Sequence, residues 1–134
     1  SAVNRESAKV QVVVARAAPT DLTLSPAGSN HALFGFRRGD REDSVEYQRF
    51  VEASPVTYVT SDDAPFLLIH GDADETVPFK NSEVMKTALE QAGVPVDLLR
   101  VPGAGHGPTF PGATNPPDYI GAMIEWLDRY LPSH

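Results

Sequence analysis

Residues 65–71 read "PFLLIHG", an unbroken apolar run that ends in a histidine and a glycine. Continuous apolar runs of this length are typical of strands that are covered on both faces, as in parallel sheets. The valine-rich stretch "VQVVV" at 10–14 and the stretch "VDLLRVP" at 96–102 are the other two predicted strands. The sequence therefore predicts a parallel sheet of about three strands.

A helix is predicted between the second and third of these strands. The stretch "NSEVMKTALEQAGVP" at 81–95 repeats apolar residues at helical spacing. Asn81 or Ser82 can cap its start, and Gly93 followed by Pro95 ends it. Such a helix can connect two parallel strands by a right-handed crossover.

Two more helices are predicted, one before the central strand and one at the end of the chain. The stretch "REDSVEYQRFVEASP" at 41–55 has acidic residues at its start and a proline near its end. In "DYIGAMIEWLDRYL" at 118–131 the expected apolar stripe consists of Ile120, Met123, Ile124, Leu127 and Leu131. Trp126 and Tyr130 lie on or beside this stripe, where we expect them to pack rather than to bind substrate.

The alternation of strands and helices predicts an α/β fold with three strands and three to four helices in one domain, residues 1–134. The segment at about 18–42 is rich in proline, glycine, serine and asparagine, and we expect a long loop or part of a lid there. In parallel sheets, ligands bind beyond the carboxyl ends of the strands. Asp72, Asp74 and His106 all follow such ends, so we expect the site at this edge.

Composition excludes several classes of partner. The chain of 134 residues has a formal net charge of −7, which disfavours nucleic acid and anionic membrane surfaces. No apolar run approaches the roughly 18 residues of a membrane span. The chain has no cysteine, so a disulfide, a thiolate metal site and a cysteine nucleophile are excluded, and the cellular compartment stays open. We expect no nucleic acid, membrane, metal or cofactor among its partners.

The carboxylates in "HGDADETVPF" at 70–79 have three interpretations. They can form a solvated turn, since aspartate is a preferred turn residue. They can form a calcium loop, because Asp72, Asp74, Thr76 and Glu83 match positions 1, 3, 5 and 12 of an EF-hand. Position 6 of that loop requires glycine, however, and the chain has Val77 there, which disfavours calcium.

The third interpretation pairs one of these aspartates with His106. A carboxylate that accepts a hydrogen bond from Nδ1 of an imidazole fixes its tautomer and leaves Nε2 to take a proton from a nucleophile. His106 lies in "GAGHG" at 103–107, where the glycines permit tight turns that direct one side chain toward a cleft. The flanking glycines therefore favour a catalytic role more than a lone histidine would, and a structural or merely exposed histidine stays open as the alternative.

Four stretches together resemble the C-terminal half of an α/β-hydrolase, of the esterase and lipase branch near the prolyl-oligopeptidase-like enzymes. They are "APTDL" at 18–22, "ASPVTYVTSDDAPFLLIHGDADETVPFKNSE" at 53–83, "ALEQAGVPVDLLRVPGAGHG" at 88–107 and "IGAMIEWLDRYL" at 120–131. The resemblance implies that Asp74, in "HGxxDxxVP", is the acid of a catalytic triad and that His106, in "GxxHG", is its base. It also implies that Asp72 and Glu75 are neighbours of the site and that His70 is a packing residue at a strand end.

The resemblance leaves the nucleophile of the triad unaccounted for. The fold requires a serine on a G-x-S-x-G turn, and no serine of this chain has glycine on both sides at that spacing. We therefore expect the serine on an N-terminal part of the same enzyme, which this chain would need for activity. If the strand at 10–14 normally pairs with an earlier strand, its free edge must be covered by that part or by self-association, so a homo-oligomer is also possible.

The resemblance further implies a function and a set of substrate contacts. His31, Phe34 and Phe36 lie in the long loop where the family has lid and acyl-pocket residues, so we expect them to bind substrate. The expected activity is that of a serine hydrolase that cleaves a small carboxylic ester, without a cofactor. A peptidase of the prolyl-oligopeptidase-like type and a non-catalytic binding or dimerisation module on the same scaffold are the alternatives.

Overall fold

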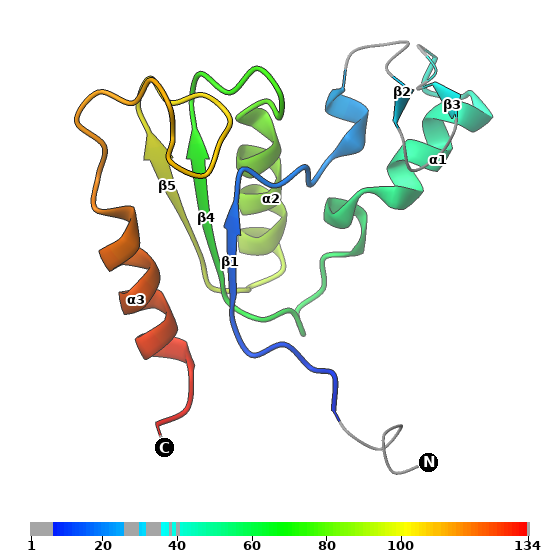
Figure 1. Cartoon of the computed structure of the whole chain (residues 1–134). Coiled ribbons are helices and arrows are strands. Elements are labelled where there is room, and N and C mark those ends of the chain that lie inside the picture. Colours follow the sequence, from blue (N-terminus) through cyan, green and yellow to red (C-terminus); the bar gives the residue numbers. More distant parts are fainter. Residues whose placement is uncertain (1–6, 26–29, 32–35, 38, 40, 134) are drawn as a thin grey trace.

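The computed structural model describes residues 7–25, 30–31, 36–37, 39 and 41–133, and its centre is a parallel sheet. The sheet consists of β1 (Val13–Arg16), β4 (Phe66–Gly71) and β5 (Val96–Val101), in the order β1-β4-β5 (Figure 1). Val13 pairs with Phe66, and Phe66 pairs with Val96, both in parallel register. The predicted α/β fold with three parallel strands is confirmed.

The first strand begins later in the chain than its apolar pattern predicts. Residues 10–14 were expected in the strand, but Val10 is 57% exposed and pairing begins at Val13. The partner sets this limit, because Val13 N donates to the carbonyl of Pro65 at the very start of the central strand. At the other end Ala17 N still donates to the carbonyl of Ile69, so the paired segment is shifted toward the C-terminus.

A helix covers each face of the sheet (Figure 1). Side chains of β4 alternate between the faces, so Leu68 packs toward α2 (Lys80–Gln91) while Leu67 and Ile69 pack toward α3 (Tyr119–Tyr130). The core between the sheet and α2 also contains Met85, Leu89 and Val94. The core between the sheet and α3 also contains Val101, Ala104, Phe110 and Trp126. Burial on both faces explains why the central strand reads as a continuous apolar run.

In the described part of the connection from β1 to β4 there are short elements and one α-helix. These are η2 (Leu22–Leu24), the antiparallel pair β2 (Asn30–His31) and β3 (Phe36–Arg37), α1 (Val45–Ala53) and η3 (Pro55–Tyr58). The helix predicted at 41–55 is confirmed as α1. The side chain of Ser44 accepts a hydrogen bond from Tyr47 N at its start, and Pro55 follows its end.

The predicted cap of α2 is wrong. The cap position is Phe79, which makes no side-chain capping bond, and the helix begins at Lys80. Asn81 is instead used for a tertiary contact: its Oδ1 accepts hydrogen bonds from the backbone N–H groups of Thr20 and Asp21 at 3.1 and 2.9 Å. The predicted end is confirmed, since Gly93 follows the helix with a φ of 77°, a conformation that favours glycine.

The predicted stripe of α3 is only partly the face that packs on the sheet. Ile120 and Ile124 are about half exposed, whereas Trp126 is buried. Four other residues of the helix pack against the core that contains Trp126: Tyr119, Ala122, Met123 and Tyr130. The packing role expected for Trp126 and Tyr130 is therefore confirmed. Among the helices of the described residues, none has both the length and the apolar character needed to cross a bilayer.

Candidate active site

The loops after β4 and β5 leave the carboxyl edge of the sheet side by side. Asp72 N donates to the carbonyl of Val101 at 3.2 Å, and Ala73 N donates to the carbonyl of Ala104 at 3.0 Å. Gly71 allows this close approach, because a Cβ at this position would lie 2.3 Å from the Ala104 oxygen. The two loops thereby bring Asp74 and His106 to the same place.

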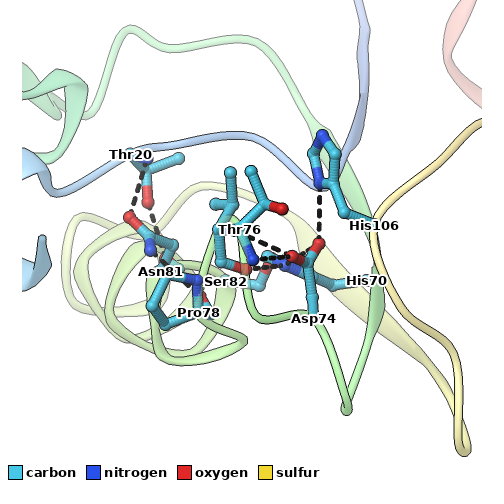
Figure 2. Close-up of polar contacts among 9 residues, drawn as sticks. Thr20, His70, Asp74, Thr76, Pro78, Asn81, Ser82 and His106 are labelled. Carbon is cyan, nitrogen blue, oxygen red and sulfur yellow. Dashed lines mark hydrogen bonds and ion pairs between the residues drawn. The ribbon is translucent and has the colours of Figure 1, made fainter. Parts of the chain in front are cut away.

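Asp74 and His106 are in direct contact (Figure 2). Nδ1 of His106 lies 2.8 Å from Oδ2 of Asp74. The carboxylate side chain has no exposed surface, while 42% of the imidazole is exposed. Since an ionised carboxylate can only accept, we assign the proton of this bond to Nδ1. In the neutral ring Nε2 then has a free lone pair, and within the described residues no hydrogen bond occupies it.

Main-chain groups hold the other oxygen of Asp74. Oδ1 accepts hydrogen bonds from Thr76 N at 2.9 Å and from Val77 N at 2.8 Å. Burial of the carboxylate disfavours its charge, but these two bonds and the contact with His106 outweigh burial and hold the pKa of Asp74 below its ordinary value. The carboxylate is therefore ionised at neutral pH and can stabilise a positive charge on the His106 ring.

Asp72 has different partners from Asp74. Its Oδ2 accepts a hydrogen bond from Nε of Arg100 at 2.8 Å, and its Oδ1 accepts one from Gly103 N at 2.7 Å. The bond from Arg100, followed by that from Gly103, lowers the pKa of Asp72. An EF-hand would require both aspartates to face one cation, but here they contact separate groups. Glu75 is exposed on the turn.

His70, for which a packing role was expected, also makes polar contacts. Its ring is fully buried and meets Phe79 edge to face at a centroid distance of 5.6 Å. Its nitrogens lie 2.7 Å from Oγ of Ser82 and 2.8 Å from the carbonyl oxygen of Val77. Nε2 also lies 3.4 Å from Oδ2 of Asp74, the oxygen that contacts His106.

A pocket of about 310 Å³ adjoins the exposed side of the imidazole. Its lining consists of Arg16, Ala17, His106, Gly107, Pro108 and Phe110. The guanidinium of Arg16 donates to the carbonyl of Pro108 and lies over the rings of Phe110 and Tyr119, 5.0 and 5.2 Å from their centroids. Sequence reasoning missed Arg16 as a lining residue of this pocket. Its only signal is its position directly after apolar residues 12–15, near the carboxyl end of a predicted strand, where ligands bind in parallel sheets.

The three residues expected to bind substrate cannot be placed beside His106. Phe34 lies outside the described residues. His31 and Phe36 pair through their backbones in the β2–β3 ladder, and their side chains also lie outside what the structure describes. Their role in substrate binding stays a prediction.

Comparison with known proteins gives this site a context. Dipeptidyl-peptidase 5 of Porphyromonas gingivalis is 32% identical over 90 residues, which are 67% of this chain and 13% of that protein. A putative carboxymethylenebutenolidase of Escherichia coli (strain K12) is 30% identical over 105 residues, which are 74% of this chain and 36% of that protein. The chain thus spans well under half the length of these relatives.

A solved structure and a family model agree with these relatives. The structure of a truncated form of a carbohydrate esterase from gut microbiota superposes with a TM-score of 0.64 at 26% identity, covering 90% of this chain and 42% of that one. The model of the prolyl oligopeptidase family, peptidase family S9, matches residues 1–134. With its parallel sheet and its aspartate and histidine at the carboxyl edge, this chain belongs to the prolyl oligopeptidase family of α/β-hydrolases.

Proposed function

We propose that this chain is part of a serine hydrolase that cleaves carboxylic esters, with Asp74 as the acid and His106 as the base of its triad. The observation that carries the proposal is the 2.8 Å contact between the buried carboxylate and the partly exposed imidazole. This arrangement positions Nδ1 against a fixed negative charge and leaves Nε2 facing the outside of the fold. It is the arrangement that activates a serine hydroxyl in hydrolases.

The reaction uses His106 first as a base and then as an acid. Nε2 takes the proton of the serine hydroxyl while the serine oxygen attacks the ester carbonyl. The Asp74 carboxylate stabilises the imidazolium that forms, and it keeps its own charge throughout. His106 then donates the proton to the leaving alkoxide, which departs as the alcohol. A water molecule repeats the sequence on the acyl-enzyme and releases the acid.

We propose that the serine comes from a part of the catalytic domain outside this chain. No serine of the chain lies in a G-x-S-x-G turn. The pocket beside His106 provides space for an approaching segment. Within the described residues β1 is paired only with β4, so its second edge can accept another strand of the same enzyme. On this proposal the chain by itself is inactive.

Substitution of the two proposed triad members tests the assignment in the enzyme that contains this chain and the serine. Asp74→Asn and His106→Ala are each expected to lower kcat/KM for p-nitrophenyl acetate by about 10⁴-fold. Glu75→Gln is the matched control, since it removes an exposed carboxylate next to Asp74 and should leave the activity intact. Full activity of either triad variant would refute the proposal.

A peptidase is the second candidate, favoured by the match to the peptidase family and by the 32% identity to dipeptidyl-peptidase 5. The same acid and base serve both reactions, so only the leaving group separates them. The test compares a dipeptidyl p-nitrophenyl ester with the p-nitroanilide of the same dipeptide. We expect the ratio of their kcat/KM values, ester over anilide, to be larger than the ratio of their rates of uncatalysed hydrolysis. The reverse order would favour the peptidase.

A non-catalytic module is excluded if a fluorophosphonate probe labels the enzyme. Such a probe reacts with an activated serine, and its reaction should depend on His106. Labelling of the unsubstituted enzyme that is lost in His106→Ala would support the hydrolase. Absence of labelling in both would favour a binding or dimerisation module.

A further inference from the structure

We propose that His70 is a positioning residue, which holds the turn that carries Asp74 and shares its Oδ2 with His106. This inference rests on the proposed triad, and it assigns to His70 more than packing. The starting observation is that one carboxylate oxygen is approached by two imidazoles, His106 Nδ1 at 2.8 Å and His70 Nε2 at 3.4 Å (Figure 2).

The contacts of His70 define its tautomer. Nε2 faces the carbonyl oxygen of Val77 at 2.8 Å and the Asp74 carboxylate at 3.4 Å, and both of these groups can only accept. Nε2 therefore carries a proton. Nδ1 faces the hydroxyl of Ser82 at 2.7 Å, which can donate to it. The neutral ring with its proton on Nε2 thus satisfies both nitrogens in a place without solvent.

The ring of His70 is itself held firmly. Its backbone belongs to β4 and pairs with Arg100 of β5, so the sheet fixes its Cα. Ser82 lies in the first turn of α2, and Phe79, just before that helix, meets the ring edge to face. The imidazole is consequently fixed between the sheet and the start of α2, and its Nε2 proton points in one direction.

The held ring fixes the turn that carries Asp74. Val77 is bound at both of its main-chain groups: its N–H donates to Oδ1 of Asp74 at 2.8 Å, and its carbonyl accepts from His70. Oδ1 thus has main-chain partners, and Oδ2 has the two imidazoles. With both oxygens engaged, the carboxylate cannot rotate about its Cβ–Cγ bond without breaking a contact. Oδ2 stays directed at His106.

The test compares His70→Leu with His70→Gln in the enzyme that contains this chain. A glutamine amide can reach the position of Nε2 and donate to the Val77 carbonyl, whereas leucine fills the space without a donor. Since small misplacements of a catalytic group can cost about 10²-fold, we expect His70→Leu to lower kcat by that order with KM almost unchanged. His70→Gln should recover most of the loss.

A second readout observes the pair directly. The proton between Nδ1 of His106 and Asp74 gives a far-downfield signal in proton NMR, which we expect to weaken or move in His70→Leu and to remain in His70→Gln. Leu89→Ala is the control for lost stability, because Leu89 is fully buried in the other core, beside Leu68 and Met85. It should change neither kcat per folded molecule nor the signal.

The outcomes separate this inference from the proposed function. If His70→Leu folds and keeps both kcat and the signal, His70 only packs, and the inference is wrong while the triad stands. If His106→Ala retains full activity, the triad itself is wrong. Should His70→Leu fail to fold, Ser82→Ala replaces it, because it removes the donor to Nδ1 and releases the ring. A few-fold lower kcat would then support the inference, and an unchanged kcat and signal would overturn it.

Discussion

Replacement of Gly71 by alanine should force apart the two loops that carry Asp74 and His106. A Cβ at residue 71 would lie 2.3 Å from the carbonyl oxygen of Ala104 and 2.8 Å from its carbonyl carbon. Both are backbone atoms, so no side chain can turn away to relieve the contact. The β4 end and the loop after β5 would have to separate by roughly 1 Å to restore an ordinary contact.

The cost of Gly71→Ala has two parts. Overpacking in a closely packed site costs about 1–3 kcal/mol of the free energy of unfolding. The Ala104 oxygen also accepts the hydrogen bond from Ala73 N at 3.0 Å, and losing that bond adds about 1 kcal/mol. We therefore expect a total loss of about 2–4 kcal/mol, which at an m-value near 2 kcal/mol/M lowers the urea midpoint by about 1–2 M.

Urea unfolding followed by circular dichroism measures this loss, and hydrolysis per folded molecule measures its effect on the site. Activity should fall as well, since Ala104 lies two residues before His106. Gly105→Ala is the matched control in the same loop, because its Cβ would meet only the Pro111 oxygen, at 3.6 Å. An unchanged urea midpoint in Gly71→Ala would show that the loops are not in contact as described.

Three further predictions concern the surroundings of this site. Because folding lowers the pKa of Asp74, its stabilising effect should be present at neutral pH and be lost as the pH falls below about 4. Asp74→Asn should therefore reduce the change of the urea midpoint between pH 7 and pH 3, while Asp72, whose pKa is also lowered, keeps part of that change. Arg16→Gln should lower kcat more than Arg16→Lys does, because only lysine keeps a cation near the Pro108 carbonyl. Asn81→Ala leaves one buried and one partly buried N–H group without an acceptor, so unfolding in urea should show a loss of about 1–3 kcal/mol, with faster amide exchange at residues 20 and 21.

The strands and helices could be predicted because their signals are local and repeated. The continuous apolar run at 65–71 predicted a strand that is covered on both faces, and β4 is buried on both faces in the structure. The limits of β1 could not be predicted, since the four valines at 10–14 fit several registers and the start of the central strand selects one. The packed face of α3 was uncertain for a related reason: Trp126 and Ile124 are both apolar, and only the sheet decides which of them is covered.

The candidate site was predictable as far as topology places residues together. Asp74 and His106 follow adjacent parallel strands, so their meeting follows from the order of elements. The contacts of His70 and Arg16 could not be derived in this way, because they depend on which side chains the neighbouring loops present. Asn81 shows the same limit: its sequence context favoured a helix cap, and a tertiary contact with the segment after β1 took its side chain instead.

The hydrogen bond from Arg16 to Pro108 has a consequence for the order in which this chain folds. It joins residues 92 positions apart, whereas the contact between Asp74 and His106 joins residues only 32 apart. Closing the longer loop costs more chain entropy, so the contact between Asp74 and His106 should form before Arg16 anchors the loop that carries His106. The pocket beside His106 would then be among the last features to form. A folding intermediate that already has this pocket would also have β1, β4 and β5 paired.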